Sequence, residues 1–145
     1  MLAQNRDDLF AVLRHLKLLL VEDDELIRDS LALFFANEGC RLEVQASAED
    51  GLQLVRVREF DVVITDFRLP GMSGLEFLRI LQEMQPEAQK ILLTAYMNEE
   101  VLAEAFRLGV HEFIEKPIAT EDIEEALARL IRRRSPTRPT LPGGV

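Results

Sequence analysis

Cysteine, tryptophan and tyrosine are nearly absent from this chain of 145 residues, which has one Cys, no Trp and one Tyr. A single cysteine, Cys40, cannot form an intramolecular disulfide and has no metal-ligand pattern around it. We therefore expect Cys40 to be a small buried hydrophobic residue, and the protein to reside in a reducing compartment. Positive charge is also scarce, because 17 Lys and Arg face 26 Asp and Glu, for a net charge of −9. Such a surface repels nucleic acid and anionic membranes, so we expect proteins or small molecules as partners.

The sequence has no apolar run with the length of a signal peptide core or a membrane span. The N-terminal stretch from 1 to 21 is interrupted by charged or ionisable residues, namely Arg6, Asp7, Asp8, Arg14, His15 and Lys17. We therefore expect a cytoplasmic protein without a membrane segment. Because 48% of the residues are hydrophobic, the chain can still form one globular domain with a core.

Short apolar runs alternate with amphipathic segments along most of the chain. Ser47 and Ser73 are candidates for helix N-caps, and Gly39 and Gly109 for helix stops. Five strands that alternate with five helices predict an open, doubly wound parallel sheet with helices on both faces. The expected strands are 16–21, 41–46, 61–65, 90–94 and 110–114, and the expected helices are 25–39, 47–60, 73–86, 98–109 and 120–134.

The two ends of the chain lie outside this pattern. Residues 1–15 are an N-terminal extension in which Leu9, Phe10 and Leu13 recur at helical spacing. This extension could form a short amphipathic helix that packs either on the domain or on a second subunit. The domain itself would span 16–134. We expect residues 135–145, which are polar and rich in proline, to be a disordered tail.

Charged and polar residues gather where the predicted strands end. In open parallel sheets, ligands bind in the crevice at the carboxyl ends of the strands, so these side chains should converge on one edge. Carboxylates about 4 Å apart repel by roughly 4 kcal/mol at an effective dielectric near 20, which favours a bound cation or raised pKa values. The residues at the strand ends are Glu22, Asp23, Asp66, Thr94, Ala95, Lys116 and Pro117.

Oxygen ligands from few protein side chains are typical of Mg²⁺, which keeps several waters and leaves room for a phosphate oxygen. With a lysine and a hydroxyl beside it, such a site favours phosphoryl transfer. The nucleophile would be a carboxylate, since no serine or cysteine stands at these strand ends. Asp66 is the best placed, because it follows the most hydrophobic strand and precedes a turn that contains Pro70, Gly71 and Gly74.

Four motifs in order now identify a family resemblance: VED at 21–23, VVITDFRLPGMSG at 62–74, ILLTA at 91–95 and FIEKP at 113–117. From about Leu16 to about Arg134, the chain resembles a receiver domain of the two-component response regulators, in the style of the chemotaxis regulators. The resemblance implies a flavodoxin-like strand order of 2-1-3-4-5. Each motif alone would be weak evidence, but together they are specific.

The resemblance also implies which residues bind the metal and the phosphoryl group. Asp66 would be the phosphoacceptor and, with Asp23, a direct Mg²⁺ ligand. The backbone carbonyl of Arg68 would be a further ligand. Glu22, which stands where many relatives have aspartate, would act through a water molecule.

A second set of residues would bind and report the phosphoryl group. Lys116, with Pro117 after it, would pair with the phosphoryl oxygens. Thr94 would rotate inward to bond one of them, and Phe113 would follow as an aromatic switch. Phe113 has no hydroxyl, so this switch would work by packing alone. Ala95 is small and would leave the entrance open.

The implied function is a phosphorylation-controlled switch, not a metabolic enzyme, although a receiver assists its own phosphorylation and autodephosphorylation. A sensor histidine kinase or a phosphotransfer protein would supply the phosphoryl group. The face formed by the fourth helix, fifth strand and fifth helix, within 98–134, would then bind a downstream output protein or a second copy in a homodimer. Arg68 and Tyr96 are bulky and flank the acceptor, so we predict that they hinder attacking water and prolong the phosphoryl state.

Several alternatives stay open from the sequence. The chain could be a stand-alone receiver, a fragment of a longer regulator with an effector domain, or a pseudo-receiver that only binds partners. A haloacid-dehalogenase-like phosphatase would need a second acid where Arg68 stands, and a flavin-binding fold would need a Ser/Thr-rich phosphate loop. Asp24 and Glu25 are expected to favour the start of a helix, and His15 and His111 to be surface residues.

Overall fold

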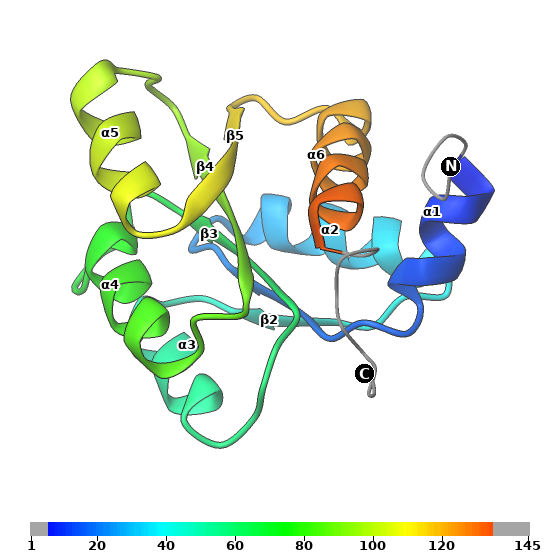
Figure 1. Cartoon of the computed structure of the whole chain (residues 1–145), viewed down its shortest axis with the longest axis horizontal. Coiled ribbons are helices and arrows are strands. Elements are labelled where there is room, and N and C mark those ends of the chain that lie inside the picture. Colours follow the sequence, from blue (N-terminus) through cyan, green and yellow to red (C-terminus); the bar gives the residue numbers. More distant parts are fainter. Residues whose placement is uncertain (1–5, 135–145) are drawn as a thin grey trace.

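A computed structural model describes residues 6–134, which form one parallel sheet between two layers of helices (Figure 1). The strand order is β2-β1-β3-β4-β5, and every pair of neighbours is parallel. The predicted doubly wound sheet and its 2-1-3-4-5 order are therefore confirmed. The strands are β1 (Leu18–Val21), β2 (Leu42–Gln45), β3 (Val62–Asp66), β4 (Gln89–Thr94) and β5 (Val110–Glu115).

The helices divide between the two faces of the sheet. Helices α1, α2 and α6 pack on one face, and helices α3, α4 and α5 pack on the other (Figure 1). Each predicted helix is present, and α1 precedes them. The helices are α1 (Arg6–Leu13), α2 (Glu25–Asn37), α3 (Ala48–Val55), α4 (Gly74–Met84), α5 (Glu99–Arg107) and α6 (Thr120–Arg134).

Strand β1 shows why these segments are apolar throughout. Leu18 and Leu20 point into the core beneath α2 and α6, whereas Leu19 and Val21 point into the core beneath α3 and α4. All four are buried. A strand that is covered on both faces needs a continuous hydrophobic run and not an alternating one.

The register of the sheet brings the strand ends to one edge. Val21 is opposite Thr65, so the residues that follow β1 lie beside the end of β3. Asp66 is opposite Leu93, and Thr94 is opposite Glu115. Four strands therefore deliver their C-terminal residues to the same edge, as the parallel arrangement requires.

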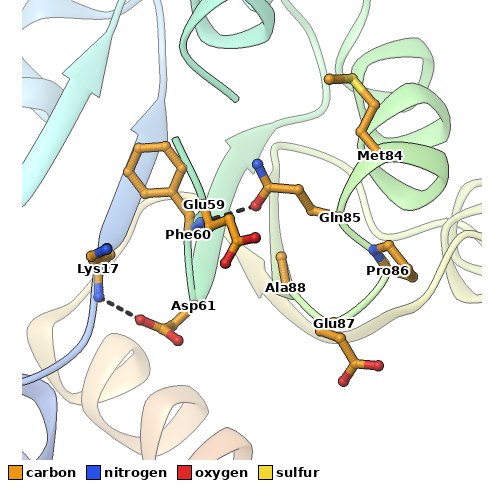
Figure 2. Close-up of a pocket in the computed structure, with 9 residues that line it drawn as sticks. All are labelled: Lys17, Glu59, Phe60, Asp61, Met84, Gln85, Pro86, Glu87 and Ala88. Atoms are coloured by element: carbon orange, nitrogen blue, oxygen red, sulfur yellow. Dashed lines mark hydrogen bonds between the residues drawn. The ribbon is translucent and has the colours of Figure 1, made fainter. Parts of the chain in front are cut away.

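The helix predicted for 47–60 is shorter than expected, because α3 ends at Val55 and not at Phe60. The chain after it is held by Gln85, the C-cap of α4. The Gln85 amide donates to the carbonyls of Val55 (2.8 Å) and Arg58 (2.7 Å) and accepts from Phe60 N (2.9 Å). Gln85 and Phe60, whose hydrogen bond is drawn in Figure 2, line a cavity of about 360 Å³ at the amino end of the sheet, opposite the edge described above.

Helix α1 packs on its own domain. Leu9, Phe10 and Leu13 are buried in the core that α2 and α6 share. Arg6 forms ion pairs with Glu38 and Glu124, which follow α2 and lie within α6. The expected tail, 135–145, lies outside the described residues. Within 6–134, none of the helices has the length and apolar character to cross a membrane.

Lys90 gives the fold a testable pH dependence. Its side chain is 2% exposed, donates to the Ala88 carbonyl (2.6 Å), and has a pKa lowered by burial from 10.5 to about 8. The unfolded chain therefore binds the extra proton between pH 8 and 10.5, so this group makes folding more favourable as pH rises through that window. Below pH 8 the cost of burying the charge is fully present.

We predict that Lys90→Met raises the free energy of unfolding at pH 7 by about 2 kcal/mol. The substitution removes the cost of burying the Lys90 charge, and the loss of one hydrogen bond offsets part of this gain. The gain should shrink as the pH approaches 10. Urea denaturation at both pH values measures the difference. A gain that is the same at pH 7 and pH 10 would contradict the explanation.

Candidate functional site

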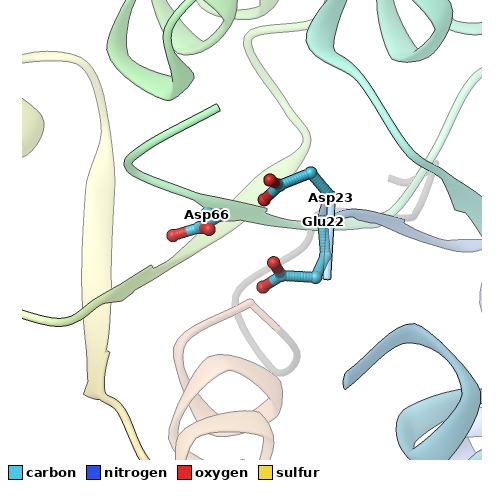
Figure 3. Close-up of side chains that lie close together, drawn as sticks. All are labelled: Glu22, Asp23 and Asp66. Atoms are coloured by element: carbon cyan, nitrogen blue, oxygen red, sulfur yellow. The ribbon is translucent and has the colours of Figure 1, made fainter. Parts of the chain in front are cut away.

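Three carboxylates meet at the carboxyl edge of the sheet. Glu22 and Asp23 follow β1, and Asp66 ends β3. One oxygen of each lies within 4.8 Å of the others (Figure 3). Glu22 is fully buried and Asp66 nearly so, whereas Asp23 is exposed at the mouth of the site. The sequence-based expectation that these side chains share a site agrees with their positions.

Lys116 brings a positive charge into this cluster from the end of β5. Its ammonium group lies 2.9 Å from Asp66 Oδ2, to which it donates, and 3.0 Å from Glu22 Oε1. Burial alone would lower the pKa of Lys116, but its contacts with Asp66 and Glu22 raise the pKa above the ordinary value. Lys116 therefore stays charged, and the peptide bond to Pro117 after it is cis.

Glu22 is the least satisfied member of the cluster. Its Oε2 accepts from Asp24 N at 3.0 Å, but its Oε1, although close to Lys116, accepts no well-aligned hydrogen bond. Burial raises the pKa of Glu22 to about 7, and the Asp66 charge adds to this, while the Asp24 amide and Lys116 oppose it. An ionised Glu22 therefore needs more positive charge than Lys116 supplies.

A hard divalent cation fits this set of oxygens. One oxygen of each carboxylate lies within 4.8 Å of the others, and the buried Glu22 Oε1 accepts no well-aligned hydrogen bond from residues 6–134. Oxygen donors with one solvent-exposed member suit Mg²⁺, which retains waters. The residues that could hold it are Asp23 and Asp66, with Glu22 behind them.

The proposed switch residues lie on the other side of the site. The Thr94 hydroxyl donates to the Tyr96 carbonyl (2.8 Å) and accepts from Tyr96 N (3.1 Å), so it is engaged with the β4–α5 loop. Ala95 is exposed, as is Tyr96. Phe113 is half-buried and packs at the edge of the core beneath α5.

Arg68 lies in the loop between β3 and α4. It lines an open pocket of about 570 Å³ together with Asp23 and Pro70. Its amide is 3.4 Å from Asp66 Oδ1. The predicted carbonyl ligand therefore belongs to the backbone that immediately borders the acceptor.

The comparison with protein families agrees with this geometry. The model of the response regulator receiver domain matches residues 18–128, which is most of the chain. The chain belongs to this family. The transcriptional regulatory protein AfsQ1 of Streptomyces coelicolor is 33% identical over 116 residues, or 80% of this chain and 51% of that protein. The chain spans about half the length of the first curated relatives that it matches.

Solved structures of receiver domains have the same fold. A CheY-like receiver domain protein from Methanospirillum hungatei superposes with a TM-score of 0.77 and 29% identity, covering 81% of this chain and 94% of that one. A response regulator from Burkholderia pseudomallei, solved with a phosphorylated aspartic acid and a calcium ion, gives 0.72 and 25%, covering 81% and 71%.

Two residues that sequence reasoning missed hold the backbone of this receiver site. Arg28 Nη1 donates to the carbonyls of Glu22 and Asp23, at 2.9 Å each. Glu49, in the first turn of α3, accepts from Met72 N at 2.9 Å. Arg28 stands one turn into α2, where a lone basic residue after an acidic run was a usable signal. The sequence contains no such signal for Glu49, because Met72, from whose amide Glu49 accepts, is 23 residues away.

Asp24 caps α2, as the sequence predicts for a carboxylate at a helix start. Its Oδ1 accepts from Leu26 N (2.9 Å) and Ile27 N (3.2 Å). Ser73 caps α4 through Glu76 N (3.1 Å). Both caps begin helices directly beside the receiver site, so they fix where the strand ends stop and the helices start.

Gly74, the first residue of α4, is needed for this geometry. A Cβ there would overlap the backbone carbonyl of Asp66, and the Gly74 amide donates to the Phe67 carbonyl at 3.0 Å. A glycine in a helix is usually improved by alanine, by roughly 0.5–1 kcal/mol. Here the neighbouring atoms are backbone, which cannot move aside cheaply.

We therefore predict the opposite sign for Gly74→Ala, a loss of about 1–3 kcal/mol in the free energy of unfolding from overpacking. Denaturation in urea measures it. An unchanged or higher stability would show that the strand end can shift to accept a side chain, and that the position of Asp66 is not fixed by Gly74.

Proposed function

We propose that this receiver domain accepts a phosphoryl group on Asp66 and acts as a phosphorylation-controlled signalling switch. The observation that carries the proposal is the cluster itself: a nearly buried carboxylate, Asp66, in direct contact with the Lys116 ammonium and beside Glu22 and Asp23. Family membership supports the same assignment. A metabolic activity of the receiver is not proposed.

An oxygen of Asp66 would attack the phosphorus atom, form an acyl phosphate bond, and break the bond to the donor's leaving group. With a phosphohistidine donor, the imidazole nitrogen keeps the bonding electrons and takes a proton. Mg²⁺, held by Asp23, Asp66 and the Arg68 carbonyl, with Glu22 through a water, would neutralise charge on the phosphoryl oxygens.

Lys116 is placed to assist the transfer. It already touches Asp66 Oδ2, so it can pair with a phosphoryl oxygen once that carboxylate is modified. Its second contact, with Glu22, keeps the ammonium at the site. The buried surroundings strengthen this attraction relative to water.

The switch would start at Thr94. To donate to a phosphoryl oxygen, its hydroxyl would give up the donor bond to the Tyr96 carbonyl, and its inward rotation would also carry it away from Tyr96 N. The β4–α5 loop would then be released from Thr94, and Phe113 could pack inward. Phosphorylation would thereby shift a pre-existing equilibrium on the face of α5, β5 and α6.

The partners follow from this role. A sensor histidine kinase or a phosphotransfer protein would supply the phosphoryl group, and an output protein or effector domain would read the switched face, with a homodimer as one form of output. The region that matches this chain makes up about half of the first curated relatives, which supports output through a further domain in a longer regulator.

Intact-mass analysis after incubation with acetyl phosphate and Mg²⁺ tests the central assignment. The wild-type chain should gain one phosphoryl group, and Asp66→Asn should gain none, because an amide cannot form the acyl phosphate. Omitting Mg²⁺ should reduce the gain sharply. Equal modification of the variant, or none of the wild type, would refute the proposal, and the latter would favour a pseudo-receiver.

The lifetime of the modification gives a second prediction. We expect Tyr96, which is exposed in the β4–α5 loop, and Arg68, in the β3–α4 loop, to hinder attacking water. Tyr96→Ala should therefore speed the loss of the phosphoryl group by several-fold, measured as the decay of the modified mass after the donor is removed. Rapid loss in the wild type that the variant leaves unchanged would count against this role.

A further inference from the structure

The loop between β3 and α4 contributes one wall of the site and is held at two places. At its base, Gly74 N donates to the Phe67 carbonyl at 3.0 Å, and Leu69 is buried in the core beneath α3 and α4. The outer part of the loop, at Gly71 and Met72, has a different support. There the contact comes from a side chain on another helix.

That side chain is Glu49. Its Oε2 accepts from Met72 N at 2.9 Å and lies 2.6 Å from the position that a Cβ on Gly71 would occupy. Gly71 has φ +78°, so the backbone turns there in the left-handed region and passes directly over the carboxylate. Glycine meets both requirements, since it tolerates the positive φ and leaves room for Glu49.

The hydrogen bond from Met72 N lowers the pKa of Glu49, so the carboxylate is charged at neutral pH and the bond is charge-assisted. Glu49 is exposed and lies outside the cluster of Glu22, Asp23 and Asp66. It can nevertheless influence that cluster, because the loop it holds carries Arg68 and forms the pocket that Asp23 faces.

We propose that Glu49 is a positioning residue for the metal site, which it serves by fastening the β3–α4 loop through Met72 N. This inference rests on the proposed function, in which the Arg68 carbonyl of the same loop helps to hold Mg²⁺. Outer residues that orient metal ligands typically contribute about 10-fold or more to affinity. Glu49 acts on the backbone of the loop and touches neither the metal nor the phosphoryl group.

The test compares Mg²⁺ affinity in four forms of the full chain, without any phosphodonor. Glu49→Ala removes the acceptor, and Glu49→Gln keeps an oxygen that can accept from Met72 N. Asp50→Ala is the matched control, because it removes a neighbouring carboxylate from the same first turn of α3, and that carboxylate forms no hydrogen bond or ion pair within residues 6–134. Backbone-amide NMR during a Mg²⁺ titration gives the Kd, and thermal unfolding of the metal-free forms gives the Tm.

We expect Glu49→Ala to raise the Kd for Mg²⁺ by about tenfold. Glu49→Gln and Asp50→Ala should stay within about twofold of the wild type, with Tm values for Glu49→Ala and Asp50→Ala alike. An unchanged Kd in Glu49→Ala would overturn the inference and leave the phosphoacceptor assignment intact. An equal loss in Glu49→Gln would also overturn it, since charge and not the hydrogen bond would then matter. A wild-type chain that binds no Mg²⁺ would overturn the proposed function as well.

Discussion

The pairing of Lys116 with Glu22 and Asp66 is the contact on which the site depends. It joins the ends of β1, β3 and β5, and it places one positive charge among three carboxylates. Burial nevertheless raises the pKa of Glu22 to about 7, although the contact with Lys116 opposes this rise. Burying two acids beside one base costs stability unless a further cation or a partner charge arrives. A divalent cation bound at this edge would offset that cost.

The rest of the architecture supports this edge. Parallel strands need helices to connect them, and those helices cover both faces with apolar side chains, so the strand ends become the place where polar residues can gather. The register opposes Val21 to Thr65 and Asp66 to Leu93, which sets the depth of each acid. Asp23 reaches the surface while Glu22 and Asp66 stay inside. The two consecutive residues after β1 thus present one exposed and one buried carboxylate.

Hydrophobic periodicity and the order of the motifs were enough to predict the sheet, its helices and the meeting of Glu22, Asp23, Asp66 and Lys116, because these follow from the parallel topology. Contacts that depend on side chains reaching between elements were not predictable. The early end of α3 at Val55 results from Gln85, far along the chain. Glu49 likewise meets Met72 only after two helices have packed on the sheet. The residues near Val55 or Glu49 in the sequence do not indicate such distant partners.

The two sides of the site differ in how firmly they are held. On the metal side, Arg28 fixes the carbonyls of Glu22 and Asp23, and Glu49 fixes the loop after Asp66. On the switch side, the Thr94 hydroxyl bonds only to the backbone of Tyr96, which is itself exposed. Catalytic geometry needs rigid support, whereas a switch needs an element that can leave its partners at little cost. Energy gained at the phosphoryl group would therefore be expressed in the β4–α5 loop, because the Thr94 hydroxyl would exchange its bonds with the Tyr96 backbone for a bond to the phosphoryl group.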